Sequence, residues 1–197
     1  NGRTGEELAQ LNGHDSAVTY VGFSRIGTPR LVTGDTEHTF LWNLNPVSRV
    51  GDRGGLDGRL GAMSSSGFST DGNRIVTMKD NLAYLIDANT GSVVATLSGH
   101  QDAVTAAEFN ADGRYLVTTS NDQSARLWQA DTGAFIVALQ DIDDGNRGSM
   151  VNARFSPHGG LLLATAVKGN PTLLWRIMPY RDQNEMLKDV EQRLWQE

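Results

Sequence analysis

A repeat of 41 to 47 residues runs through most of this 197-residue chain and limits what it can fold into. Phenylalanine recurs at Phe23, Phe68, Phe109 and Phe155, and a tryptophan or isoleucine follows each one at Trp42, Ile86, Trp128 and Trp175. A unit of this length cannot bury its apolar face alone, so such a period indicates supersecondary units that pack against their neighbours.

The clearest unit runs from Gly99 to Gly133 and predicts three short strands. Apolar and polar residues alternate over 104–109, 115–119 and 124–128, which is typical of strands. Turn sequences centred on Asp112-Gly113 and Asn121-Asp122 separate these segments, and a fourth strand is predicted over 134–139. Since the template fits three more times, the predicted fold class is all-β.

These motifs resemble those of WD-repeat β-propellers, and the resemblance covers residues 4 to about 177. It implies a β-propeller of four-stranded antiparallel blades, with about four blades present. The implied segments are 1–12 as the outer strand of a preceding blade, 13–50 as blade one, 51–98 as blade two, 99–140 as blade three and 141–178 as a fourth blade of three strands.

The first residues repeat a boundary between blades. TGEELAQLNGH at 4–14 matches TGSVVATLSGH at 90–100, where one blade closes and the next begins. Propellers of this kind usually close with more blades than 197 residues supply. We therefore expect the C-terminal portion of a longer bacterial WD-repeat protein, with the missing blades supplied by another fragment, another copy or a partner.

The resemblance also implies a buried hydrogen-bonded tetrad in blade three, formed by His100, Thr118, Asp122 and Trp128, with Ser120 as an alternative hydroxyl. In blade one it implies His14, Thr33 and Trp42, with Thr36 or Glu37 near the aspartate position. An aspartate in a tight turn needs donors, and imidazole, hydroxyl and indole groups can supply or relay them. A structural role is therefore favoured over a catalytic one.

The other two blades depart from this pattern. Blade two keeps Asp80, but Ile86 stands in the indole position and no Gly-His pair precedes its first strand. Blade four also lacks the Gly-His pair and has Gly169-Asn170-Pro171 where an aspartate would stand. We expect these blades to depend on apolar packing and strand pairing.

Residues 179–197 have a different pattern and predict a short amphipathic C-terminal helix. Asp182 and Glu185 have the spacing of a capping box, and Leu187, Val190 and Leu194 recur at helical spacing. The helix could pack against the propeller or dock a partner. The end of the chain also resembles the C-terminal ends of bacterial signalling proteins that join a STAND-type NTPase or protease module to WD repeats.

Composition argues against several classes of function. The net charge of −6, with scattered Lys and Arg, disfavours nucleic-acid binding, and no apolar run is long enough to cross a membrane. The absence of cysteine excludes disulfides and thiolate sites and suits a cytoplasmic protein. The acidic segment 141–148 lacks the EF-hand order, so a solvated loop is favoured over a calcium site, and the glycine-rich segment 53–61 lacks a phosphate-loop ending. We predict no metal, no cofactor and no catalytic residue.

The function predicted is a non-catalytic protein–protein interaction scaffold that binds a protein or peptide at one loop face. The loops before the first strands and the middle turns share this face, and their candidate residues are Asp15, Ser16, Lys79, Asn81, Gln101, Asp102, Asn121 and Lys168. Two alternatives stay open. One is the sensor or regulatory part of a bacterial multidomain signalling protein with a STAND-type NTPase or protease upstream, and the other is a self-assembling propeller that closes by oligomerisation.

Overall fold

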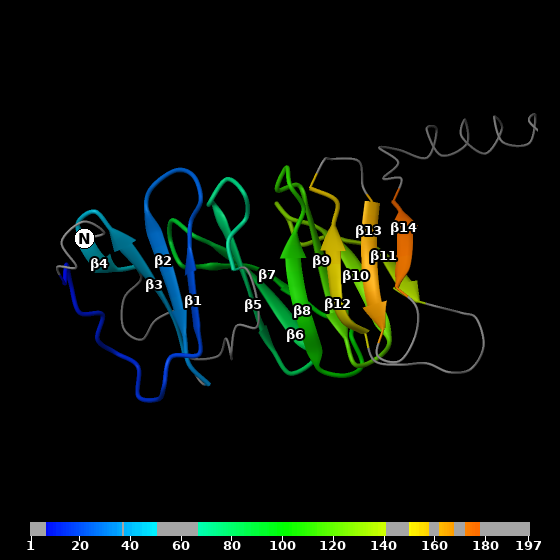
Figure 1. The fold of residues 1–197 in the computed structure, drawn as a ribbon, viewed down its shortest axis with the longest axis horizontal. Coiled ribbons are helices and arrows are strands. Elements are labelled where there is room, and N and C mark those ends of the chain that lie inside the picture. The colour runs from blue at the N-terminus through cyan, green and yellow to red at the C-terminus, as the bar shows by residue number, and fades with distance from the viewer. Residues whose placement is uncertain are drawn as a thin grey trace, which may run out of the picture.

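The computed structural model describes residues 7–36, 38–50, 67–140, 150–157, 162–167 and 172–177, which form four antiparallel sheets (Figure 1). The first sheet contains β1 (Tyr20–Phe23), β2 (Arg30–Gly34), β3 (Thr39–Leu44) and β4 (Val47–Arg49), and the second contains β5 (Arg74–Lys79), β6 (Leu82–Asp87) and β7 (Val93–Leu97). The third contains β8 (Val104–Phe109), β9 (Tyr115–Ser120), β10 (Ser124–Gln129) and β11 (Phe135–Gln140), and the fourth contains β12 (Met150–Phe155), β13 (Leu162–Val167) and β14 (Leu173–Arg176).

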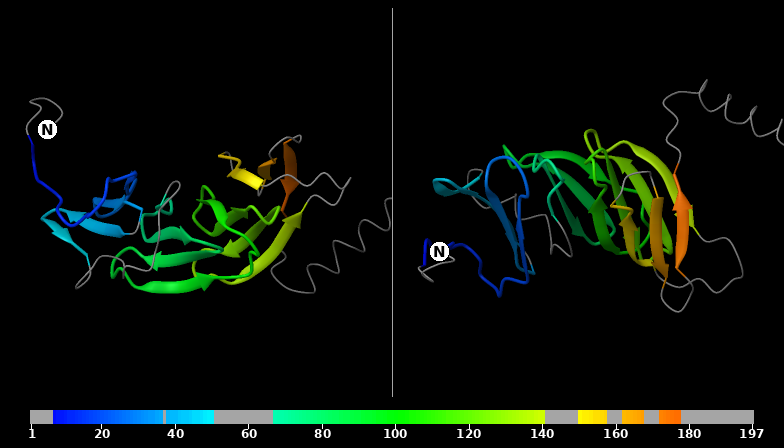
Figure 2. Two further views of the ribbon diagram at one scale, coloured as in Figure 1. Left: turned by 90° about the horizontal axis from the view of Figure 1, so that it is seen from below. Right: turned by 45° about the horizontal axis from the view of Figure 1, so that its top comes forward.

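Each sheet is an up-and-down meander in which strands adjacent in the sequence are hydrogen-bonded neighbours. The four sheets stand side by side along an open arc (Figure 2). The all-β prediction of about four antiparallel blades is therefore confirmed, and no helix occurs among the described residues. The helix predicted over 179–197 lies outside them.

Two predicted strands differ from what the structure shows. In the second sheet, the described residues form three strands, and Phe68 makes only an isolated bridge to Ile75 in place of a fourth. The predicted outer strand in 1–12 is described over 7–12, where the chain pairs with no strand. Leu11 instead packs against the cluster of Leu31, Phe40 and Trp42 in the first sheet, so apolar side-chain contact holds this segment.

The apolar core lies between neighbouring sheets. Leu41, Leu85 and Leu127 occupy equivalent positions in the third strand of their units, and each is 0% exposed. They belong to three separate clusters, which join the first sheet to the second, the second to the third and the third to the fourth. The apolar side chains of each sheet are thus buried largely by contact with the neighbouring sheet, as expected for a repeat fold.

Candidate functional site

The structure brings the four predicted tetrad residues of the third sheet together. Trp128 Nε1–H donates to Thr118 Oγ1 at 2.9 Å, and Thr118 Oγ1 lies 2.8 Å from His100 Nε2. The other ring nitrogen, Nδ1, lies 2.9 Å from Asp122 Oδ2. Ser120 is not the tetrad hydroxyl, because its Oγ donates to the carbonyl oxygen of Asp102.

Neutral His100 satisfies every hydrogen bond in this network. Thr118 accepts from the indole, donates its own hydroxyl proton to Nε2, and His100 Nδ1–H donates to the carboxylate. A proton on Nε2 would leave the Thr118 hydroxyl without that acceptor. Burial accordingly lowers the pKa of His100, although Asp122 opposes the shift. Burial alone would raise the pKa of Asp122, but hydrogen bonds from Ser124, the Gln101 N–H and His100 outweigh it and lower that pKa to about 2.

These two shifts predict that the protein loses stability in acid. The unfolded chain protonates His100 near its ordinary pKa of 6.5, so stability falls as the pH drops below about 6.5. A further loss of about 2 kcal/mol is expected between pH 3.8 and about 2, where unfolded Asp122 binds a proton before the folded carboxylate does. Urea unfolding at several pH values measures both losses. Asp122→Asn should flatten the lower part of the profile, and Asp131→Asn, at an exposed carboxylate outside the network, is the control; an unaltered Asp122→Asn profile would contradict this assignment.

The first sheet contains a second complete tetrad, and its aspartate was predicted wrongly. His14 Nδ1 lies 2.8 Å from Asp35 Oδ2, His14 Nε2 lies 2.7 Å from Thr33 Oγ1, and Trp42 Nε1–H donates to Thr33 at 2.9 Å. Asp35 therefore takes the aspartate position that the sequence assigned to Thr36 or Glu37. Thr36 is exposed, and Glu37 lies outside the described residues. The turn here is shorter, so a carboxylate nearer the threonine reaches the imidazole.

The remaining sheets keep only parts of the network. In the fourth sheet Trp175 Nε1–H donates to Thr165 Oγ1 at 2.9 Å. In the second sheet Thr77 takes the equivalent position and is 0% exposed, but its hydroxyl has no hydrogen-bond partner within the described chain. The side chain of Ile86, also 0% exposed, has no N–H group to donate to it. The segment 169–171 lies outside the described residues.

Seven of the eight predicted binding residues lie in the described chain, and all seven are exposed; Lys168 lies outside it. Loops of the second and third sheets are joined directly, since Asn81 Nδ2–H donates to the His100 carbonyl at 3.1 Å and Val104 N–H donates to the Asp80 carbonyl at 2.7 Å. Asn121 N–H binds the Ala103 carbonyl at 3.0 Å. Asn81, Gln101, Asp102 and Asn121 thus share one firmly held surface, whereas Asp15 and Ser16 precede the first sheet.

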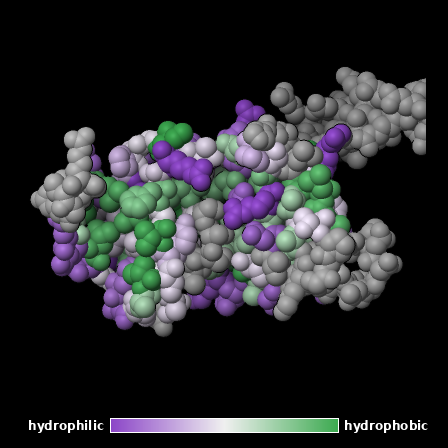
Figure 3. Space-filling view, in the orientation of Figure 1, coloured by the Kyte–Doolittle hydropathy of each residue, from purple (hydrophilic) through white to green (hydrophobic). Residues whose placement is uncertain are grey.

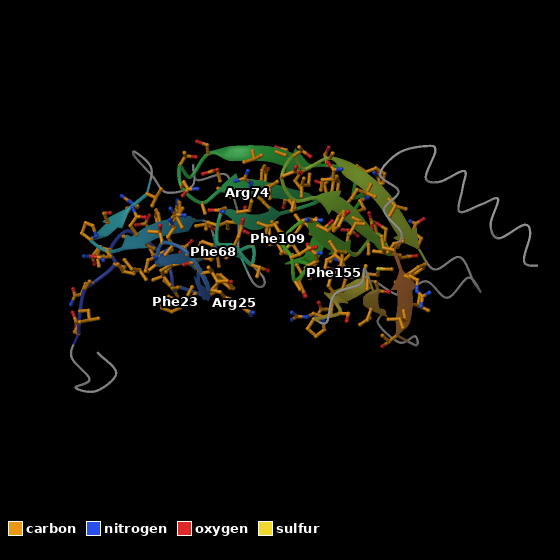
Figure 4. The ribbon with its side chains drawn as sticks, turned by 90° about the horizontal axis from the view of Figure 1, so that it is seen from above. Phe23, Arg25, Phe68, Arg74, Phe109 and Phe155 are labelled. Carbon is orange, nitrogen blue, oxygen red and sulfur yellow. The ribbon has the colours of Figure 1, made fainter. Side chains whose placement is uncertain are left out.

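A cleft of about 360 Å³ lies at the opposite end of the strands from these loops. Phe23, Phe109 and Phe155 are the last residues of β1, β8 and β12, and they line the cleft with Phe68. Figure 4 shows these phenylalanines along the concave side of the arc. Tyr20 and Arg25 also line the cleft, together with Thr70, Glu108, Asn110 and Arg154.

The same type of turn occurs in the first three sheets and fixes the backbone that follows the phenylalanine. The polar residue after Phe23, Phe68 or Phe109 accepts a hydrogen bond from the N–H where the next strand begins. The three bonds, each 2.9 Å long, join Arg30 N–H to Ser24 Oγ, Arg74 N–H to Ser69 Oγ and Tyr115 N–H to Asn110 Oδ1. Such a side-chain acceptor replaces a backbone partner in the turn.

The charged groups of the cleft differ in their partners. Arg154 Nη1–H donates to Glu108 Oε2 at 2.8 Å, and the Glu108 side chain is 19% exposed. Burial raises the pKa of Glu108, although Arg154 and the Phe155 N–H favour the carboxylate. Arg25 is exposed and has no carboxylate partner among the described residues. The cleft therefore presents aromatic rings beside an available guanidinium group.

The sequence singled out the four phenylalanines as markers of the period, but it did not place them in a site. The described residues contain no group of three or more His, Asp or Glu side chains suited to a metal ion. No helix among them could span a membrane.

Comparison with known proteins gives the family. A family model described as "WD domain, G-beta repeat" matches residues 91–129, which hold most of the third sheet and its tetrad. This is a WD-repeat, propeller-like protein. The WD-repeat protein also resembles the crystal structure of the computationally designed Ika4 protein, with a TM-score of 0.64 and 23% identity over 89% of this chain and 100% of that one. This likeness shows the fold alone.

Several curated proteins are similar to parts of the WD-repeat protein. U3 small nucleolar RNA-associated protein 21 of Saccharomyces cerevisiae is 37% identical over 100 residues, covering 51% of this chain and 10% of that protein. Guanine nucleotide-binding protein subunit beta of Arabidopsis thaliana is 28% identical over 171 residues, covering 84% and 45%. Nuclear distribution protein PAC1 of Arthroderma otae is 32% identical over 136 residues, covering 63% and 29%. The chain spans less than half the length of these relatives, and its predicted bacterial origin stays a prediction.

Proposed function

We propose that this WD-repeat protein is a non-catalytic scaffold that binds a peptide segment of another protein in the concave cleft. WD-repeat proteins generally act as protein–protein interaction scaffolds. The observation that carries the proposal is the cleft of about 360 Å³, in which phenylalanines from all four units meet beside Arg25. Aromatic and arginine side chains dominate the binding energy of protein interfaces, so this composition suits a peptide.

The cleft also suggests the chemistry of the segment. Phe23 is 64% exposed and offers apolar surface to an incoming side chain. Arg25 offers a cation with no carboxylate bound to it in the described chain, whereas Arg154 is already paired with Glu108. A segment with an apolar side chain next to a carboxylate would therefore complement this end of the cleft.

A random-peptide library displayed on phage and panned on the 197-residue chain tests this proposal. Enriched peptides should pair an apolar residue with an acidic one. Phe23→Ala should weaken their binding about 10- to 30-fold by calorimetry at a concentration where the chain is monomeric, because it removes the most exposed ring of the cleft. Arg25→Glu should also weaken it, and Arg114→Glu, which reverses an exposed arginine that is not itself among the residues lining the cleft, should not. Peptides that bind Phe23→Ala and Arg25→Glu as tightly as the unaltered chain would contradict the proposal.

The loop face is a second candidate, because its backbone is held by the tetrad of the third sheet. Gln101 N–H donates to Asp122 Oδ2 at 2.9 Å, and Ser120 Oγ donates to the Asp102 carbonyl at 2.8 Å. Exposed side chains on a fixed backbone lose little conformational freedom on binding. Peptides that are lost with Asp102→Lys and kept with Phe23→Ala would assign binding to this face.

The hydrogen bonds of the two buried His–Asp pairs support the proposed lack of catalysis. His14 and His100 each bind a threonine on one ring nitrogen and an aspartate on the other, so neither imidazole has a nitrogen left for a substrate. We further propose a cytoplasmic location, because the chain has no cysteine. A role as the sensor of a bacterial multidomain signalling protein remains part of the proposal and would be tested by the identity of the captured peptide.

A further inference from the structure

The leucine that fills each interface between sheets is exposed in the fourth sheet. Leu41, Leu85, Leu127 and Leu174 each stand one residue before the Trp or Ile position of their unit. The first three are 0% exposed, whereas Leu174 is 72% exposed. The face of the fourth sheet that carries Leu174 is therefore built like an interface that the described structure leaves open.

In the first sheet, apolar side chains are exposed on the face that points away from the second sheet. Phe109 and Phe155, at the ends of β8 and β12, are each 8% exposed, whereas the equivalent Phe23 is 64% exposed. Two residues earlier, Ala107 and Ala153 are 1% and 3% exposed, whereas the equivalent Val21 is 55% exposed. Figure 3 shows hydrophobic side chains gathered over this first sheet.

The internal interfaces show what covers such a face. The cluster between the second and third sheets packs Leu85 and Val76 against Ala107 and Phe109. The cluster between the third and fourth sheets packs Leu127 and Val117 against Ala153 and Phe155. In each case the leucine face of one sheet meets the phenylalanine face of the next. The open leucine face and the open phenylalanine face are thus the two halves of one interface type, held at opposite ends of the arc (Figure 1).

We propose that two copies of this chain bind head to tail, so that the Leu174 face of one copy docks on the Val21 face of the other. Phe23 would then be covered as Phe109 and Phe155 are, so the cleft with an exposed Phe23 belongs to the separate chain. The same contact made twice would join two arcs of four sheets each into a ring of eight. Eight is within the range of blade numbers at which propellers close, and a head-to-tail contact that closes yields a ring instead of a filament.

Light scattering after size-exclusion chromatography of the 197-residue chain tests the proposal, each chain having a mass of 21.4 kDa. A species of two chains is expected. Val21→Asp and Leu174→Asp should each weaken the association at least about 100-fold, because each would bury a charge without a partner in an apolar contact. Val94→Asp, which alters an exposed valine of the outer strand β7, should leave the dimer intact. Circular dichroism checks that each variant is folded.

Mixing the two variants separates a head-to-tail contact from one between identical faces. The Leu174 face of a Val21→Asp copy is unaltered, and so is the Val21 face of a Leu174→Asp copy. The mixture should therefore regain a two-chain species through one intact interface, while each variant alone remains monomeric. A monomeric unaltered chain would overturn the proposal and leave both faces to another partner. A dimer that only one of the two substitutions disrupts would also overturn it.

Discussion

Replacing Leu127 by alanine is expected to lower the free energy of unfolding by about 3–5 kcal/mol. The side chain is 0% exposed and packs between the third and fourth sheets, against Ala153 and Phe155. Alanine would remove apolar contacts and leave a cavity that the two sheets cannot fill without shifting. Urea denaturation followed by circular dichroism measures the loss.

Leu174→Ala is the matched control, because it makes the same change at the equivalent position of another unit. Leu174 is 72% exposed, so the expected loss is below about 0.5 kcal/mol at a concentration where the chain is monomeric. Equal losses for the two variants would show that the exposure of this position does not differ between the sheets as described.

Replacing threonine by valine should destabilise the third sheet but not the second. Thr118→Val is expected to lower the free energy of unfolding by about 2–4 kcal/mol, because it leaves a buried indole N–H and a buried imidazole nitrogen without partners. Both groups bind Thr118 Oγ1, at 2.9 and 2.8 Å. The same urea measurement reports the change.

The Thr77→Val change removes a buried hydroxyl that has no hydrogen-bond partner in the described chain. Valine has nearly the same shape and needs no partner, so this variant should be as stable as the unaltered chain or up to about 1 kcal/mol more stable. A destabilisation as large as that of Thr118→Val would mean that the Thr77 hydroxyl has a partner in solution.

The sequence predicted the sheets because the repeat period and the strand alternation are local signals. Val104, Ala106 and the turn at Asp112-Gly113 indicate strands and a reversal with no knowledge of the neighbouring unit. The structure brings the four predicted tetrad residues of the third sheet together, since the motif spacing there is the one typical of the family. The first sheet has a shorter turn, and counting residues from Trp42 pointed past Asp35 to Thr36 or Glu37.

The cleft could not be predicted in the same way. Phe23 and Phe155 are far apart in the sequence, and they line one cleft only because successive sheets turn along an arc. The pairing of Glu108 with Arg154 depends on the same curvature, since their strands belong to different sheets. Periodicity fixes which face of a strand is apolar, but the angle between sheets comes from side-chain packing across each interface.

The tryptophans that bind these threonines can also report on individual sheets through their intrinsic fluorescence. Trp42, Trp128 and Trp175 each donate an indole N–H to a threonine at 2.9 Å, one in each of three sheets. The second sheet has Ile86 at this position and contributes no tryptophan emission. With Trp195, which lies outside the described residues, replaced by phenylalanine, the emission would come from three indoles that share this threonine hydrogen bond. Replacing two of them in turn would make a single sheet visible while it unfolds.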